Sequence, residues 1–406
     1  MSKVTIEEKF DELISEMTLA EKASLLAGGD VWHTVPVERL GIPTIKVTDG
    51  PNGVRGADDV FSPTSICFPV GVAMGATWNP DLIGQVGTAL AESVKAKGAH
   101  VLLAPTVNIQ RTPIAGRNFE CYAEDPYLSG TMAAAFIAGL QNEGVSACIK
   151  HFVGNDQEYQ RFSISAQVAE RPLHEIYLEP FRIALQQANP WSVMSAYNRV
   201  NGVYASENEE LLRHILKDKW QYDGLVMSDW FGTYSDGVPK GGLDLEMPGP
   251  ARYMTADKVI AAIGAGELDE AVVDDKVRRL LRLAERVGAF GQPGIKPETV
   301  HDNPADRALA RQTAAEAVVL LKNENSVLPI DLEQVTSIAV IGENARWAQV
   351  MGGGSAAVKP HYVMSPLDGI RKRVGEQVSV AYELGTPCLL YTSPSPRDLR
   401  QDLVCR

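Results

Sequence analysis

Short apolar runs alternate with helix-like segments along the first 250 residues, and most runs end in a polar or charged side chain. In the run 223–230, Leu, Val and Met precede Ser, Asp229 and an indole. The same pattern recurs at 44–49, 101–108, 147–151, 192–198 and 243–246. It predicts parallel strands joined by helices. A (β/α)8-like (TIM) barrel brings strand carboxyl ends to one mouth, where the loops build the active site.

The chain of 406 residues is longer than one ordinary domain, and the pattern divides it. We expect a barrel over 1–290, a turn-rich linker over 291–312 and the start of an α/β sandwich domain over 313–385. Residues 386–406 change composition sharply, so we expect this tail to be non-native or disordered.

Particular elements are predicted within this outline. We expect helix over 1–28 with a capping box at Thr18 and Glu21. Apolar residues at helical spacing predict a helix over 270–288 that Gly288 ends, and another helix over 306–322. A buried strand is expected over 337–342, followed by a flexible loop at 352–355.

Composition and charge narrow the class of protein. The net charge of −13 argues against a nucleic-acid partner, because phosphates would find no basic stripe. The acidic N-terminus does not resemble a signal peptide, and no apolar run approaches the ~20 residues of a membrane helix. We therefore expect a cytoplasmic protein without a membrane partner; a secreted form and a homo-oligomer stay open.

The cysteine pattern indicates neither a disulfide framework nor a metal site. The five cysteines are odd in number and lack ligand spacing. Cys148 lies within a predicted strand and is most simply a small buried apolar residue. We expect no metal and no cofactor.

Two strand ends carry the candidate catalytic groups. Asp229 is either a helix cap or salt-bridge partner, or a carboxylate nucleophile beside the aromatic Trp230. Lys150 is either a Schiff-base nucleophile with a pKa depressed by burial, or, with His151, a hydrogen-bond donor to ligand hydroxyls. The residues alone leave these alternatives open.

Other polar residues near strand ends add to this set. Asp49 either closes an Asx-type turn or accepts two ligand hydroxyls, with Arg55 nearby. Arg117 is either part of a weak surface ion pair with Glu120 or Glu124, or a fixed donor. Acids, fixed donors and an indole together suit an uncharged polyhydroxylated ligand such as a sugar. The set comprises Asp49, Arg55, Arg117, Lys150, His151, Tyr197, Asp229 and Trp230.

With these motifs in order, the chain resembles glycoside hydrolase family 3, in particular its fungal-type β-glucosidases. The resemblance covers about 5–385 and includes Tyr127. The motifs lie at 47–55, 116–120, 149–152, 171–181, 194–198, 226–230 and 352–355. It implies a TIM-like barrel followed by an α/β sandwich, with the active site between them.

The resemblance also implies residue roles. It makes Asp229 the nucleophile of retaining hydrolysis of terminal β-D-glucosyl residues, in a β-glucoside or oligosaccharide substrate such as those of cellulose breakdown. It maps the glucose subsite onto Asp49, Arg55, Arg117, Lys150, His151, Met194, Tyr197 and Trp230. A second carboxyl group, ~5–5.5 Å from the first, must protonate the leaving oxygen.

The chain departs from this family at the proton donor. In fungal-type relatives the acid/base is a Glu of the second domain, after an inserted module, and this chain stops near the start of that insertion. Glu120 and Glu246 are stand-ins that better suit structural roles. A bacterial-type branch instead uses a loop His, and the loop 153–158 contains none. A sugar-binding fragment without catalysis and a Schiff-base lyase using Lys150 remain alternative functions.

Overall fold

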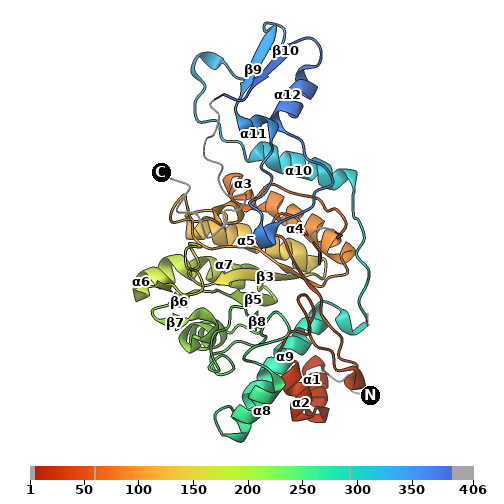
Figure 1. Cartoon of the computed structure of the whole chain (residues 1–406), viewed down its shortest axis with the longest axis vertical. Helices are drawn as coiled ribbons and strands as arrows, with labels where there is room; N and C mark the ends of the chain where they lie inside the picture. The colour runs from red at the N-terminus through yellow and green to blue at the C-terminus, as the bar shows by residue number, and fades with distance from the viewer. Residues whose placement is uncertain (1–4, 59–60, 292–293, 386–406) are drawn as a thin grey trace.

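A computed structural model describes residues 5–58, 61–291 and 294–385, which form a barrel-like body and a smaller second unit (Figure 1). Five parallel strands in the order β1-β2-β3-β5-β8 form the main sheet. They are β1 (Val47–Asp49), β2 (Val101–Leu103), β3 (Ser146–Phe152), β5 (Ser192–Ser195) and β8 (Leu225–Met227). Every residue of these strands is buried, as expected for a parallel sheet covered on both faces.

Single bridges close this sheet into a ring. Met227 pairs in parallel with Leu245, and Ala27 pairs in parallel with Glu246. The segment that follows then pairs antiparallel, at His33, with Lys46 just before β1. The predicted barrel-like fold is therefore confirmed, with five regular strands and irregular closing segments.

Helices cover the outside of the sheet, and the longest pack against one another. α4 packs on α5 and α5 packs on α7. Asn79 and Asp125 cap α4 and α5, each followed by a proline in the first turn. The barrel helices are α3 (Gly71–Ala76), α4 (Pro80–Ala96), α5 (Pro126–Asn142), α6 (Glu170–Pro172), η3 (Leu173–Tyr177), α7 (Glu179–Ala188), η5 (Glu210–Lys219), α8 (Ala256–Gly264) and α9 (Glu270–Arg286). The short strands β4 (Ser165–Ala166), β6 (Arg199–Val200) and β7 (Val203–Tyr204) form a separate sheet.

The N-terminal segment forms two helices in place of one continuous helical region. α1 (Ile6–Glu16) and α2 (Leu19–Ser24) each begin with a capping box. The box predicted at Thr18 and Glu21 is confirmed, and it is also the reason for the break, because a capping residue takes extended backbone angles. Residues 25–28 leave the helix to join the ring closure.

Later helix predictions had mixed outcomes. The helix expected over 270–288 is α9, and Gly288 follows it with φ +67°. The helix expected over 306–322 ends early, because α10 (Pro304–Glu316) stops just before two consecutive β-branched valines. Residues 318–321 are exposed and outside any helix or strand.

The second unit is a small α/β arrangement. Its strands β9 (Ser337–Ile341) and β10 (Ser379–Glu383) pair in parallel, and it contains α11 (Glu343–Arg346) and α12 (Pro366–Val374). The strand expected at 337–342 is present, but the expectation that it is buried was wrong. With only two described strands in this sheet, most residues of β9 stay exposed. The predicted atypical tail, 386–406, lies outside the described residues.

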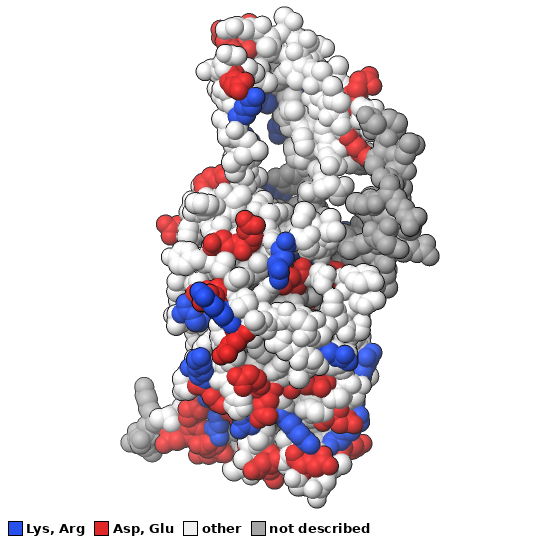
Figure 2. All heavy atoms as spheres, turned by 90° about the vertical axis from the view of Figure 1, so that its left-hand side faces the viewer, with Lys and Arg blue, Asp and Glu red and all other residues white. Residues whose placement is uncertain are grey.

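The surface is charged but mixed. Figure 2 shows acidic side chains interspersed with Lys and Arg on one face, most densely over the lower part of the barrel. Within the described part of the chain, no helix has both the length and the apolar content for crossing a membrane.

A segment of the second unit, 350–361, lies on the strand-end face of the barrel. The backbone N–H of Ser65 donates to Lys359 O at 2.9 Å, and that of His361 donates to Ser65 O at 3.1 Å. Gly352 lies against the Phe119 ring, where a Cβ would come within 2.2 Å of Cε1. The glycine-rich loop is thus held beside the barrel by a contact that only glycine allows, and its second half forms the helical turn η8 (Gly354–Ala356).

This contact predicts that Gly352→Ala destabilises the chain by ~1–3 kcal/mol through overpacking against Phe119. Thermal unfolding measures the change. Gly369→Ala in α12 is the matched control, because its new methyl group meets nothing within 4 Å and alanine favours a helix. Equal melting temperatures for the two variants would contradict the packing of 350–361 on the barrel.

Candidate active site

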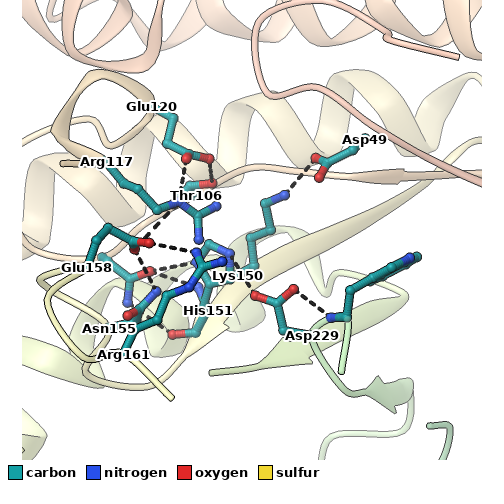
Figure 3. Close-up of polar contacts among 12 residues, drawn as sticks. Asp49, Thr106, Arg117, Glu120, Lys150, His151, Asn155, Glu158, Arg161 and Asp229 are labelled. Atoms are coloured by element: carbon teal, nitrogen blue, oxygen red, sulfur yellow. Dashed lines mark hydrogen bonds and ion pairs between the residues drawn. The ribbon is translucent and has the colours of Figure 1, made fainter. Parts of the chain in front are cut away.

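The strand ends bring the predicted polar residues together at one rim of the barrel (Figure 3). Asp49 ends β1, Lys150 and His151 lie near the end of β3, and Asp229 follows β8 by two residues. Their side chains are almost entirely buried; even Asp229 is only 8 % exposed. Buried charges require partners, so the pairing among them determines what each group can do.

Lys150 is committed to a salt bridge with Asp49. Its Nζ donates to Asp49 Oδ1 at 2.7 Å, and Lys150 is 1 % exposed. The same carboxylate oxygen accepts the backbone N–H of Gly50 at 2.8 Å. A charged ammonium is not a nucleophile, so this geometry favours Lys150 as a donor over the Schiff-base alternative.

His151 is oriented by Asn108. Its Nδ1 lies 2.9 Å from Asn108 Oδ1, and its backbone N–H donates to the same oxygen at 3.0 Å. Since a carbonyl oxygen only accepts, Nδ1 must carry the hydrogen. Nε2 then faces Asp229 Oδ2 at 3.5 Å. From that position Nε2 donates only when the ring is protonated, and it accepts when the ring is neutral.

The two oxygens of Asp229 are held differently. Oδ1 accepts the backbone N–H of Trp230 at 2.7 Å, which fixes the carboxyl group on its own turn. Oδ2 is buried and has no hydrogen-bond partner among the described residues. An oriented carboxylate whose second oxygen faces only the side chains of His151 and Tyr197 is the arrangement that a nucleophile needs.

The surroundings of Asp229 shift its pKa in opposite directions. Burial raises its pKa above the ordinary aspartate value, while Arg117 and Lys150 oppose that rise. For Tyr197, burial and then the charge of Asp229 raise the phenol pKa well above 10.0. Tyr197 therefore stays protonated beside the carboxylate and remains a hydrogen-bond donor.

Arg117 belongs to a buried ion network. Its Nε donates to Glu120 Oε1 at 2.6 Å and lies 3.9 Å from Glu158 Oε1. Arg117 is 6 % exposed, so the ion pair with Glu120 exists but is buried, and the expectation of a weak surface pair was wrong; the second carboxylate is that of Glu158. Burial opposes the charged form, but Glu120 and Glu158 outweigh it and raise the pKa of Arg117.

An aromatic wall flanks Asp229. The rings of Trp230 and Trp32 lie 5.6 Å apart between centroids, tilted by 42°. The indole N–H of Trp230 donates to Val31 O at 3.0 Å, and that of Trp32 donates to Ala57 O at 3.0 Å. The guanidinium of Arg55 lies 5.4 Å from the Trp32 ring, within cation–π range. Trp32 was missed from the sequence because it stands in a loop without a strand-end pattern.

A second aromatic group supports Tyr197. Phe162 packs edge-on against its ring, with centroids 4.9 Å apart. The guanidinium of Arg161 lies 4.5 Å from the same ring and pairs with Glu158 at 2.6 Å. Met194 is buried in β5. The loop with Glu158 and Arg161 is thus part of the site, although no pattern in the sequence marked these two residues.

The stand-in acids are occupied elsewhere. Glu246 accepts the hydroxyl of Thr233 at 2.6 Å and three backbone N–H groups, from Arg252, Tyr253 and Met254. Glu120 is held by Arg117 and by the hydroxyl of Thr106 at 2.9 Å. Both carboxyl groups therefore have structural roles, as expected.

Neither metal nor thiol chemistry finds support in the described residues. Within 5–58, 61–291 and 294–385, no three His, Cys, Asp or Glu side chains are grouped to hold a metal ion. Cys148 is buried in β3, where burial raises the pKa of its thiol to about 12, in keeping with the predicted apolar role.

Comparison with known families gives two adjoining matches. Residues 26–283 match the glycosyl hydrolase family 3 N-terminal domain. Residues 318–400 match the glycosyl hydrolase family 3 C-terminal domain.

Curated relatives carry consistent names. A β-glucosidase of Rhizobium radiobacter is 51% identical over 377 residues, covering 92% of this chain and 46% of the relative. Probable β-glucosidase J of Aspergillus fumigatus is 48% identical over 377 residues, covering 91% of this chain and 43% of the relative. The chain thus spans less than half the length of these relatives.

Solved structures show the same likeness. The β-glucosidase of Kluyveromyces marxianus in complex with glucose superposes with a TM-score of 0.88 at 43% identity, covering 92% of this chain and 46% of that one. β-Glucosidase 3B of Thermotoga neapolitana in complex with glucose gives a TM-score of 0.84 at 38% identity, with 93% and 55% coverage.

The buried salt bridge yields a first prediction for this site. Asp49→Asn should destabilise the chain by ~3 kcal/mol, because it leaves the Lys150 ammonium buried without a countercharge. The double variant Asp49→Asn with Lys150→Met should recover most of that loss. Denaturant unfolding of both single variants and the double variant measures the coupling, and simple additivity of the two losses would contradict the pairing.

Asp156, a half-buried acid on the loop that carries Glu158, predicts that the stability of the fold depends on pH. Burial raises the pKa of Asp156 to about 7, only partly offset by Arg111 and the Ile109 backbone. Since the folded-state pKa lies above the unfolded value, stability is lost as pH rises from about 4 through 7. Asp156→Asn should remove this loss, so its advantage in melting temperature over the wild type should grow between pH 5 and pH 8. A constant difference across that range would count against the assignment.

Proposed function

We propose that this chain, which belongs to glycosyl hydrolase family 3, binds a terminal β-glucosyl residue at the barrel rim and attacks it with Asp229. One observation carries the proposal: Asp229 is fixed through Oδ1, while its buried Oδ2 has no hydrogen bond of ordinary length among the described residues and faces His151 Nε2 at 3.5 Å. The names of the relatives and their complexes with glucose support the choice of sugar.

In the proposed first step, Asp229 Oδ2 forms a bond to the anomeric carbon of the glucosyl residue. The bond from that carbon to the aglycone oxygen breaks, and its electron pair leaves with the oxygen, which takes up a proton. In the second step, water attacks the same carbon, loses a proton to a base and releases Asp229. Two inversions leave the configuration of the sugar retained.

The surrounding residues have proposed roles in holding the sugar. The carboxylate of Asp49 accepts hydroxyl protons, and Lys150 donates from within the salt bridge. Arg117 supplies positive charge near Asp229, which favours the ionised nucleophile. Arg55, His151, Met194 and Tyr197 complete the subsite, and Trp230 with Trp32 provides an apolar wall for a pyranose face.

The proposed activity of this chain depends on which group protonates the leaving oxygen. Glu120 and Glu246 are saturated by structural contacts, so we do not assign them this role. An activated aryl aglycone needs little protonation to leave. We therefore propose that this chain forms the glycosyl-enzyme from activated aryl glucosides faster than it hydrolyses it. Binding of glucose without labelling of Asp229 would instead favour a sugar-binding fragment.

Covalent trapping tests the proposal. The chain is incubated with an activated 2-deoxy-2-fluoro-β-glucoside, and intact-mass and peptide-mapping measurements should find a single sugar attached to Asp229. Fluorine at C2 slows both steps, but the activated leaving group lets the first proceed and the intermediate accumulate.

Two variants make the result interpretable. Asp229→Asn should remain folded and unlabelled, because the amide is not a nucleophile. Asp156→Asn, which alters another acid near the site, should label as the wild type does. Attachment at a different carboxyl group, or labelling of Asp229→Asn at the wild-type rate, would refute Asp229 as nucleophile.

A further inference from the structure

A second polar cavity lies on the outside of the barrel, away from the strand-end rim. It has a volume of about 400 Å³ and is lined from η5, α9 and the segment between them. Lys217, Lys276, Arg279 and Arg213 supply its basic side chains. The cavity lies near the start of β8, because Arg279 in its lining donates to the backbone oxygens of Tyr222 and Gly224 just before that strand, whereas Asp229 follows the strand's end.

Two lysines at this cavity, whose side chains are largely buried, share one carboxylate. Lys217 Nζ lies 2.5 Å from Asp244 Oδ1, and Lys276 Nζ lies 3.9 Å from the same oxygen. Lys276 is 2 % exposed, and its hydrogen bond is to the backbone oxygen of Leu243, which carries no charge. The ammonium of Lys276 therefore lacks a carboxylate in direct contact.

The neighbouring charged side chains do not balance the positive charge of Lys276. Arg279 pairs with Asp275 at 2.9 Å, so Lys217, Lys276 and Arg279 face the two carboxylates Asp244 and Asp275. One positive charge remains in excess, and Arg213 at the exposed rim adds a second without an ion pair among the described residues.

The remaining charged residues of the lining are occupied or turned to solvent. Asp269 caps α9 through the backbone N–H of Ala271, and Asp218 is exposed. Lys240 pairs with Glu267 at 3.0 Å. None of these side chains compensates Lys276.

A buried ammonium that is only partly compensated is unfavourable, and the pKa of Lys276 reflects this cost. Burial, followed by repulsion from Lys217, lowers the pKa of Lys276 to about 7, although Asp244 and Asp275 oppose the shift. A bound anion would supply the missing countercharge and would satisfy the free donors of Lys276 and Arg213.

We propose that this cavity binds a phosphate group, held by Lys276 at its base and Arg213 at its rim. Phosphate suits the site because it carries up to two negative charges and several acceptor oxygens, which match one ammonium and one guanidinium fork. The site is independent of Asp229 and of the proposed glucosidase reaction.

Isothermal titration of the whole chain with inorganic phosphate tests this site, at constant ionic strength set with chloride. We expect saturable binding of one phosphate per chain in the millimolar range or tighter. Arg213→Ala should weaken binding by about tenfold through loss of its charged fork. Lys219→Ala is the matched control, because Lys219 is exposed on the same helix but does not line this cavity.

A second variant addresses the base of the cavity. Lys276→Met keeps the apolar stem and removes the charge, so it should abolish binding without loss of folding. If it fails to fold, Arg213→Ala alone decides. A parallel titration with a phosphate monoester, glycerol phosphate, shows whether the site takes free phosphate only or an esterified group as well. No saturable binding of either probe, or equal binding by the wild type and Arg213→Ala, would overturn the proposal.

Discussion

The salt bridge between Lys150 and Asp49 is the interaction on which the site depends. It joins the ends of β3 and β1, which are separated in the ring by β2. Because both groups are almost fully buried, neither can move away without leaving a charge unpaired. The bridge thereby holds Lys150 in place beside His151, which Asn108 orients toward Asp229.

The charged side chains at the rim are held in two ways, some by ion pairs and one by a backbone N–H. Glu120 and Glu158 hold the Arg117 guanidinium, and Asp49 holds the Lys150 ammonium. Asp229 differs, because a backbone N–H fixes one of its oxygens and the other lacks a hydrogen bond in the described structure. Other buried carboxylate oxygens of the described residues, such as Asp156 Oδ1, also lack a hydrogen bond, but Asp229 Oδ2 lies at the strand-end rim, 3.5 Å from His151 Nε2, where a ligand bound at the rim meets it. This contrast is the physical basis of the proposed nucleophile.

The sequence predicted the strand-end residues well, because a parallel barrel turns separate sequence positions into neighbours at one rim. Asp49, Lys150, His151 and Asp229 were found this way. Trp32, Glu158 and Arg161 were not, since they lie in irregular loops whose path depends on tertiary contacts. The same limit applies elsewhere: residues 317–322 have an apolar pattern that fits a helix, yet α10 ends before them. The local sequence pattern was enough to predict the regular helices and strands. The positions of the loop residues depend on side-chain contacts across the rim, which that pattern does not show.

The most direct measurement is a crystal structure of this chain with bound glucose. We predict a pyranose lying on Trp230, with its hydroxyls on Asp49 and Lys150 and its anomeric carbon about 3–3.5 Å from Asp229 Oδ2. Glucose bound with its anomeric carbon turned away from Asp229, or bound only at another surface, would contradict it.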